Sequence, residues 1–134
     1  MSRKAISSTL AAAIGPYSHA VESNGLLFLS GQTPVDPASG KLVEGDVGPQ
    51  TEQCLRNLFN VLSAAQLSEE DVISVNVYLT DMNDFAQMNA IYARHFTAPF
   101  PARTTIGCAS LPLAAKVEIG LIARLPTARG TTPT

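Results

Sequence analysis

Apolar and polar residues alternate most regularly from Val72 to Thr80. Successive side chains of a strand point to opposite faces, so this alternation predicts a strand with one fully apolar face. That face would consist of Ile73, Val75, Val77 and Leu79.

Two segments carry apolar residues at helical spacing instead. Asp46 is placed to cap the first helix, Pro49 fits its first turn, and the pattern predicts an end near Ala65. Asp81 is placed to cap the second helix. The apolar stripes, which we expect to be core, are Cys54, Leu55, Leu58, Phe59 and Leu62 in the first helix and Phe85, Met88, Tyr92 and Phe96 in the second.

The first third of the chain has the pattern of short strands. A strand is predicted near residues 5–8, before a break at Gly15-Pro16. Asn24-Gly25 lies between two strand-like runs, and this pair accepts the positive φ of a hairpin turn. The second run, residues 26–31, is apolar on both faces and therefore predicts an interior strand. Residues 32–45 read as a loop.

Residues 100–123 predict two further strands, joined by a loop that contains Leu111-Pro112. In the first strand Arg103 and Thr105 share a face, and in the second Glu118 lies opposite the apolar residues. Each strand thus carries one charged residue on a face that is otherwise small or apolar. We therefore look for chemistry there.

The predicted order is three strands, a helix, a strand, a helix and two strands, an α+β arrangement. Two amphipathic helices can cover one face of such a sheet but not both. We expect the other face, bearing Tyr78, Arg103, Thr105 and Glu118, to meet another copy of the chain. Burying two charged residues at such an interface is costly unless they pair with opposite charges or bind a ligand. We therefore expect a site that is shared between subunits.

Composition adds few constraints. The 134 residues predict a single domain over residues 1–134, with 126–134 as a flexible tail. Hydrophobic residues make up 46% and charged residues 15%, which favours oligomerisation. A net charge of -2 argues against nucleic acid as a partner. No signal peptide or membrane span is recognised, so we expect no membrane partner and a cytoplasmic protein, with Cys54 and Cys108 as reduced thiols.

Several motifs together resemble the RidA/YjgF family of reactive-intermediate deaminases, over residues 5–125. They are Ile14-Gly15-Pro16-Tyr17, Leu29-Ser30-Gly31-Gln32, Asn83-Asp84-Phe85 with Met88-Asn89, Pro101-Ala102-Arg103-Thr104, and Leu111-Pro112 with Val117-Glu118-Ile119. The resemblance implies the chorismate-mutase-like α+β fold, of the bacillus type, in a homotrimer with a central barrel and clefts between subunits. It also implies hydrolysis of 2-imino acids and their enamine tautomers to 2-keto acids and ammonia, without a metal or organic cofactor.

The family's functional residues map onto this chain as follows. Arg103 matches the arginine that binds the substrate carboxylate, and Glu118 matches the acidic residue near the attacking water. Tyr17 matches the tyrosine of the cleft, and Asn89 matches the asparagine on the helix. Ser30 and Gly31 match the family's Ser-Gly pair, which would provide a polar contact or a close approach of the backbone. Many relatives carry a cysteine where this chain has Thr105, whose hydroxyl or carbonyl could reach the water.

Each assignment has an alternative reading. Arg103 and Glu118 could be salt-bridge residues, Tyr17 a packed aromatic, and Ser30-Gly31 a simple turn. Asn89 could brace a loop, and Thr105 could be an ordinary strand residue. Cys108 lies three residues beyond Thr105, hence on the other face, and does not replace the cysteine. Other functions left open are a non-catalytic keto-acid binder or chaperone-like protein, a deaminase of a larger catabolic enamine, and a ribonuclease.

Overall fold

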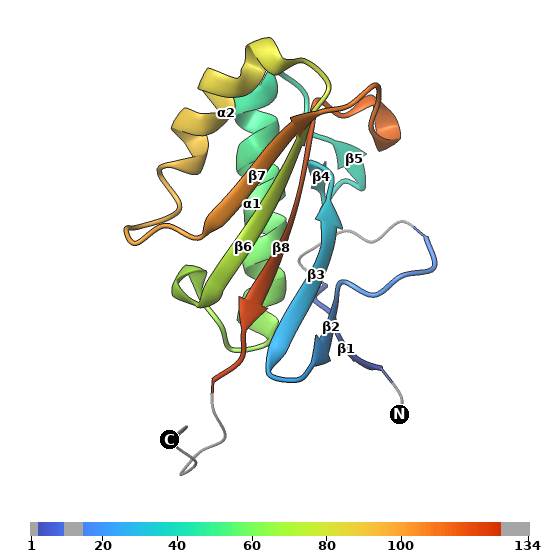
Figure 1. The fold of residues 1–134 in the computed structure, drawn as a ribbon. Coiled ribbons are helices and arrows are strands. Elements are labelled where there is room, and N and C mark those ends of the chain that lie inside the picture. The colour runs from blue at the N-terminus through green and yellow to red at the C-terminus, as the bar shows by residue number, and fades with distance from the viewer. Residues whose placement is uncertain (1–2, 10–14, 127–134) are drawn as a thin grey trace.

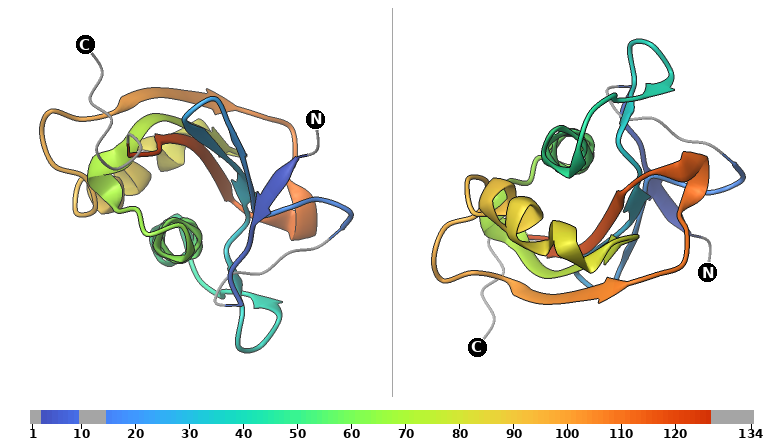
Figure 2. Two further views of the ribbon diagram at one scale, coloured as in Figure 1. Left: turned by 90° about the horizontal axis from the view of Figure 1, so that it is seen from below. Right: turned by 90° about the horizontal axis from the view of Figure 1, so that it is seen from above.

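The computed structural model describes residues 3–9 and 15–126. A six-stranded sheet runs in the order β1-β2-β3-β8-β6-β7, and both long helices lie on one face of it (Figures 1 and 2). The α+β class and the predicted order of the main elements are thereby confirmed. The strands are β1 (Lys4–Ile6), β2 (Ala20–Ser23), β3 (Leu26–Gln32), β4 (Val35–Asp36), β5 (Lys41–Leu42), β6 (Val72–Leu79), β7 (Ala102–Gly107) and β8 (Val117–Arg124), and the helices are α1 (Val47–Ala64) and α2 (Phe85–Tyr92), with short 3-10 helices η1 (Glu69–Asp71), η2 (Met82–Asp84) and η3 (Pro112–Ala114).

The hairpin predicted at Asn24-Gly25 is present. Strands β2 and β3 are antiparallel, and the two turn residues have φ of 50° and 79°. Strand β3 is an interior strand as predicted, because it pairs with both β2 and β8.

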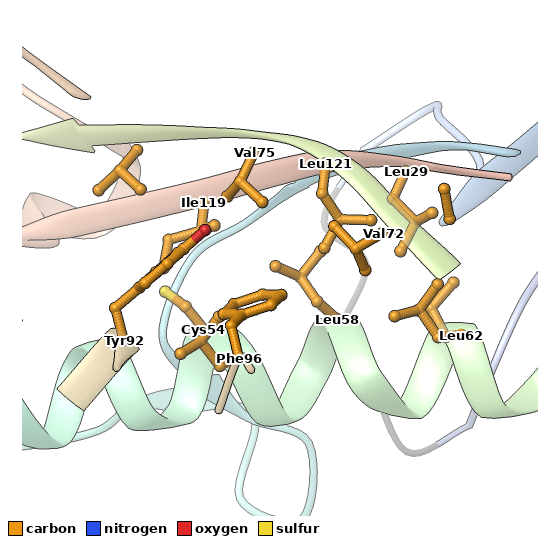
Figure 3. Close-up of a cluster of buried hydrophobic side chains, with 14 of the residues drawn as sticks. Leu29, Cys54, Leu58, Leu62, Val72, Val75, Tyr92, Phe96, Ile119 and Leu121 are labelled. Carbon is orange, nitrogen blue, oxygen red and sulfur yellow. The ribbon is translucent and has the colours of Figure 1, made fainter. Parts of the chain in front are cut away.

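Helix α1 packs its apolar stripe on the sheet. Its N-cap is Asp46, whose carboxylate accepts a hydrogen bond from the Val47 amide at 2.9 Å, and it ends at Ala64. Leu58 and Leu62 meet Val75, Leu121 and other strand side chains in the core (Figure 3). Since both helices cover this face, the sheet's other face is left open.

Strand β6 departs from the predicted alternation at its start. Val75, Val77 and Leu79 are buried, but Ile73 is 41% exposed. The pairing of β6 with β8 shifts register between Val72 and Ser74, which turns Val72 inward in place of Ile73. The prediction of one fully apolar face was therefore wrong at this position.

Other details also differ from the sequence prediction. Asp81 accepts a hydrogen bond from the Asn83 amide and caps η2, the turn before α2, rather than α2 itself. The predicted loop at residues 32–45 contains a small hairpin, β4 with β5. The predicted flexible tail falls almost entirely on residues 127–134, outside the described residues. Within the described residues no helix is long and apolar enough to cross a bilayer.

Asn57 fixes the loop after β3 to helix α1. Its buried amide donates to the carbonyl oxygens of Thr33 (3.3 Å) and Val35 (2.9 Å) and accepts from Gln53 at 2.9 Å. We expect Asn57→Ala to lower the free energy of unfolding by about 2–3 kcal/mol, because two carbonyls lose a partner inside the protein. Gln53→Ala, which keeps both bonds to the loop, should cost under about 1 kcal/mol. Urea unfolding measures both, and equal losses would contradict this role.

Candidate active site

Arg103 and Glu118 lie on opposite faces of the sheet. Strand β6 separates β7 from β8; Arg103 is in register with Val75, whereas Glu118 is in register with Tyr78. Val75 points into the core beneath the helices, so Arg103 and Thr105 share the helix-covered side, and Tyr78 and Glu118 share the open side. The prediction that these four side chains occupy one face was wrong. Alternation along a strand shows which of its residues share a face, but it does not show which of the two faces the helices cover.

The two charged residues are also far apart along the sheet. Their register partners on β6 are three residues apart and two strand spacings separate β7 from β8, so their Cα atoms lie roughly 14 Å apart. Their side chains diverge from there. Within one chain they belong to two separate clefts.

The first cleft surrounds Arg103 and has a volume of about 290 Å³. The half-buried guanidinium lies over two rings of α2, with Cζ 4.6 Å from the Tyr92 centroid and 5.6 Å from the Phe85 centroid. Within the described residues no Asp or Glu forms an ion pair with it. Its planar donors therefore remain available for an external carboxylate. The lining residues are Asn89, Tyr92, Ala93, Phe100, Pro101 and Arg103.

The hydroxyl groups of Tyr92 and Thr105, on the Arg103 side of the sheet, are buried and have no hydrogen-bond partner among the described residues. Burial raises the pKa of the Tyr92 phenol, against a smaller lowering effect of the nearby Arg103 charge. Thr105 lines neither the Arg103 cleft nor the Glu118 cleft, whereas Asn89 does line the Arg103 cleft.

The second cleft surrounds Glu118 and has a volume of about 370 Å³. Ser30 braces its wall, because its hydroxyl donates to the Ser18 carbonyl at 2.6 Å and its amide donates to the His19 carbonyl at 2.9 Å. Tyr17 is 45% exposed beside it. The sequence-predicted Tyr17, Ser30, Gly31 and Glu118 are thus brought together. The lining residues are Tyr17, Ser30, Gly31, Thr33, Pro112, Leu113 and Glu118.

Burial raises the pKa of the Glu118 carboxyl. Its side chain lies over Gly31, at the irregularity in the pairing of β3 with β8. A carboxylate that is partly withdrawn from water in this way is a stronger base than one in solution. This group can accept a proton from a water molecule in the cleft.

Neither cysteine lies beside Arg103. Cys108 lines a neighbouring cavity on the open side together with Tyr78 and Glu118, on the opposite face from Thr105 as predicted. Cys54 is fully buried in α1, where burial, with a further contribution from the Glu118 charge, raises the pKa of its thiol. Both are free thiols.

Gly31 leaves room for the observed position of the Glu118 carboxylate, because a β-carbon there would overlap Oε2 of Glu118 and lie 3.1 Å from its Cδ. We expect Gly31→Ala to displace the carboxylate and to lower kcat/KM for the reaction catalysed in this cleft about 100-fold, since a misplacement of about 1 Å has effects of that size. The melting temperature should change little, because the far end of a side chain can move aside. Full activity in the Gly31→Ala protein would contradict this function of the glycine.

Several residues that line the clefts were not assigned to a site from the sequence, among them Tyr92, Phe100, Pro112 and Leu113. Phe85 and Tyr92 are seven residues apart, which places both on one face of α2. That spacing was read only as core, because nothing in the sequence shows that β7 passes beneath this helix. Within residues 3–9 and 15–126 no three His, Cys, Asp or Glu side chains are arranged to hold a metal ion, and we assign no metal ligand.

Comparison with known proteins gives consistent matches over the whole fold. A family model described as Endoribonuclease L-PSP matches residues 7–125. A RutC family protein of Pyrococcus horikoshii is 48% identical over 110 residues, 82% of this chain and 87% of the relative. The 2-iminobutanoate/2-iminopropanoate deaminase of Mus musculus is 46% identical over 122 residues, 90% of each chain. The crystal structure of E. coli TdcF with bound serine is 38% identical, with a TM-score of 0.86 over 92% of this chain and 99% of that one.

Proposed function

The chain belongs to the RidA/YjgF family, and from this membership and the two clefts we propose that it hydrolyses 2-imino acids and their enamine tautomers to 2-keto acids and ammonia. The observation that carries the proposal is an arginine in one cleft that forms no ion pair with any described residue, and a carboxylate with a raised pKa in another. The first suits the carboxylate of a small acid, and the second suits a water molecule.

We further propose that each active site is made by two copies of the chain. A small imino acid cannot bridge two groups that lie roughly 14 Å apart and point away from each other, so one chain cannot bind both ends. The Arg103 cleft of one copy would face the Glu118 cleft of the next. Phe28 and Ile106, 43% and 46% exposed, provide apolar surface for such contacts. A homotrimer with three shared clefts satisfies these conditions, and a chain that stays monomeric in dilute solution would contradict it.

The reaction follows from this arrangement. The substrate carboxylate binds the guanidinium of Arg103, which the rings of Phe85 and Tyr92 hold in place. Glu118 takes a proton from water as its oxygen attacks C2 of the protonated imine, which gives a carbinolamine. Glu118 then returns that proton to the nitrogen. As the C–N bond breaks and ammonia leaves, Glu118 takes the proton of the carbinolamine hydroxyl, which gives the 2-keto acid, and releases this proton to solvent. Because protonated imines are electrophilic, orientation and charge placement suffice without a cofactor.

The remaining residues have supporting functions in this proposal. Tyr17 and Ser30 shape the wall beside Glu118, and Gly31 leaves room for its carboxylate. Asn89 offers a side-chain amide at the rim of the Arg103 cleft. The Thr105 hydroxyl is buried and lines neither cleft, so we propose that it supports the strand that carries the arginine rather than contacting the water.

A coupled assay tests the function. A threonine dehydratase generates the imine in the presence of semicarbazide, which traps it, and the protein should divert imine from the trap to keto acid. Binding of a keto acid without this acceleration would favour a non-catalytic binder instead. Running the assay with imines of increasing size tests whether a larger enamine is the preferred substrate.

The family description also suggests a ribonuclease. The net charge of -2 offers little attraction to a polyanion. RNA cleavage that persists at constant specific activity through purification would support a ribonuclease. Loss of RNA cleavage during purification would exclude a ribonuclease.

A further inference from the structure

Leu113 has a backbone conformation that leucine rarely adopts. It lies in the turn η3 with φ of 61° and ψ of 20°, and Ala114 follows with φ of 57°. The left-handed region crowds a β-carbon against the backbone, so glycine or asparagine would be more relaxed at this position. Strain of this kind is retained mainly where a site needs it.

The side chain of Leu113 is not used for core packing. It is 52% exposed and lines the cleft that holds Glu118. The strained turn therefore presents an apolar side chain to the site, next to Pro112. Across the proposed shared cleft, the Arg103 side contributes another exposed apolar residue, Phe100, at 62% exposure.

We propose that Leu113 determines specificity by forming an apolar wall for the substrate side chain. The inference rests on the proposed function and defines its substrate class: 2-imino acids with an extended apolar side chain, in preference to those with a methyl group or a carboxylate. Among the described residues that line this cleft, Glu118 is the one that carries a charge, so an acidic side chain would meet repulsion from it that no lysine or arginine of this lining offsets.

Three variants separate this wall from a structural role. Leu113→Asn removes the apolar surface but suits the left-handed conformation, and Leu113→Met keeps the apolar surface. Met82→Asn is the matched control, because Met82 is 47% exposed and lines neither the Arg103 cleft nor the Glu118 cleft. An L-amino-acid oxidase supplies the imines of leucine, alanine and glutamate, and kcat/KM is measured for each.

In Leu113→Asn the ratio of kcat/KM for the leucine imine to that for the alanine imine should fall about tenfold, the usual effect of lost apolar contact in a pocket. Leu113→Met and Met82→Asn should keep the ratio within about twofold. The melting temperature of Leu113→Asn should equal or exceed that of the wild type, because strain is relieved. Calorimetry measures binding of the corresponding keto acids, pyruvate for alanine and 4-methyl-2-oxopentanoate for leucine. In Leu113→Asn the affinity for 4-methyl-2-oxopentanoate relative to that for pyruvate should fall in the same way.

The outcomes distinguish the two proposals. If the wild type accelerates imine hydrolysis and Leu113→Asn leaves both the ratio of kcat/KM and the relative affinity for the two keto acids unchanged, the specificity inference is overturned and the function stands. If the wild type accelerates no imine, the function fails and the substrate assignment fails with it.

Discussion

Replacing Arg103 by alanine should lower kcat/KM for a 2-imino acid about 1000-fold. The lost interaction is a two-pronged, charge-assisted hydrogen bond in a half-buried cleft, for which about 4 kcal/mol is expected. Arg103→Lys should recover only part of the activity, because an ammonium group keeps the charge but not the planar pair of donors. The coupled imine assay measures both variants.

The matched control is Arg124→Ala, which removes an exposed arginine at the end of β8. It should leave kcat/KM unchanged. An Arg103→Ala protein as fast as the wild type would remove the proposed mechanism, since none of the other described residues that line either cleft is a lysine or arginine.

Glu118→Gln should lower kcat by about 100- to 10000-fold, the range for loss of a general base. The same change should raise the melting temperature at pH 7, because it removes a charge that burial disfavours. Opposite changes in activity and stability are typical of a residue kept for function. A variant that loses activity only because it unfolds would show both quantities falling.

The pH dependence follows from the direction of the pKa shift. Burial raises the pKa of Glu118 above the ordinary value for a glutamate, so the acid limb of kcat/KM should have its midpoint above that value and should be absent in Glu118→Gln. The protonated form is the one that folding favours. Its contribution to stability is complete below the unfolded pKa and is lost as the pH rises through the folded pKa. The stability gain of the glutamine variant should therefore disappear at low pH.

Much of the fold could be predicted because local chemistry fixes it. The Asn24-Gly25 turn, the Asp46 cap and the apolar stripe of α1 act over a few residues. The inward turn of Val72 could not be predicted, since it depends on how β6 pairs with β8, which is distant in sequence.

The site divides in the same way. The cleft around Glu118 contains four of the residues chosen from the sequence, and the resemblance of their motifs to a family identified them. The prediction that Arg103 and Glu118 lie on one face of the sheet within one chain was wrong. It failed because β6 lies between β7 and β8, and this order is set by tertiary pairing. The aromatic support of Arg103 was missed for a related reason: Phe85 and Tyr92 read equally well as core until α2 is placed over β7.

Subunit mixing tests most directly whether two copies build each site. Arg103→Ala and Glu118→Gln chains, each nearly inactive alone, are dissociated and reassembled together in equal amounts. If each cleft of a trimer takes its arginine from one copy and its carboxylate from the next, about one quarter of the clefts regain both groups. We expect the mixed sample to recover about one quarter of wild-type activity, whereas a mixed sample that stays as inactive as its parents would show that the clefts are not shared between copies.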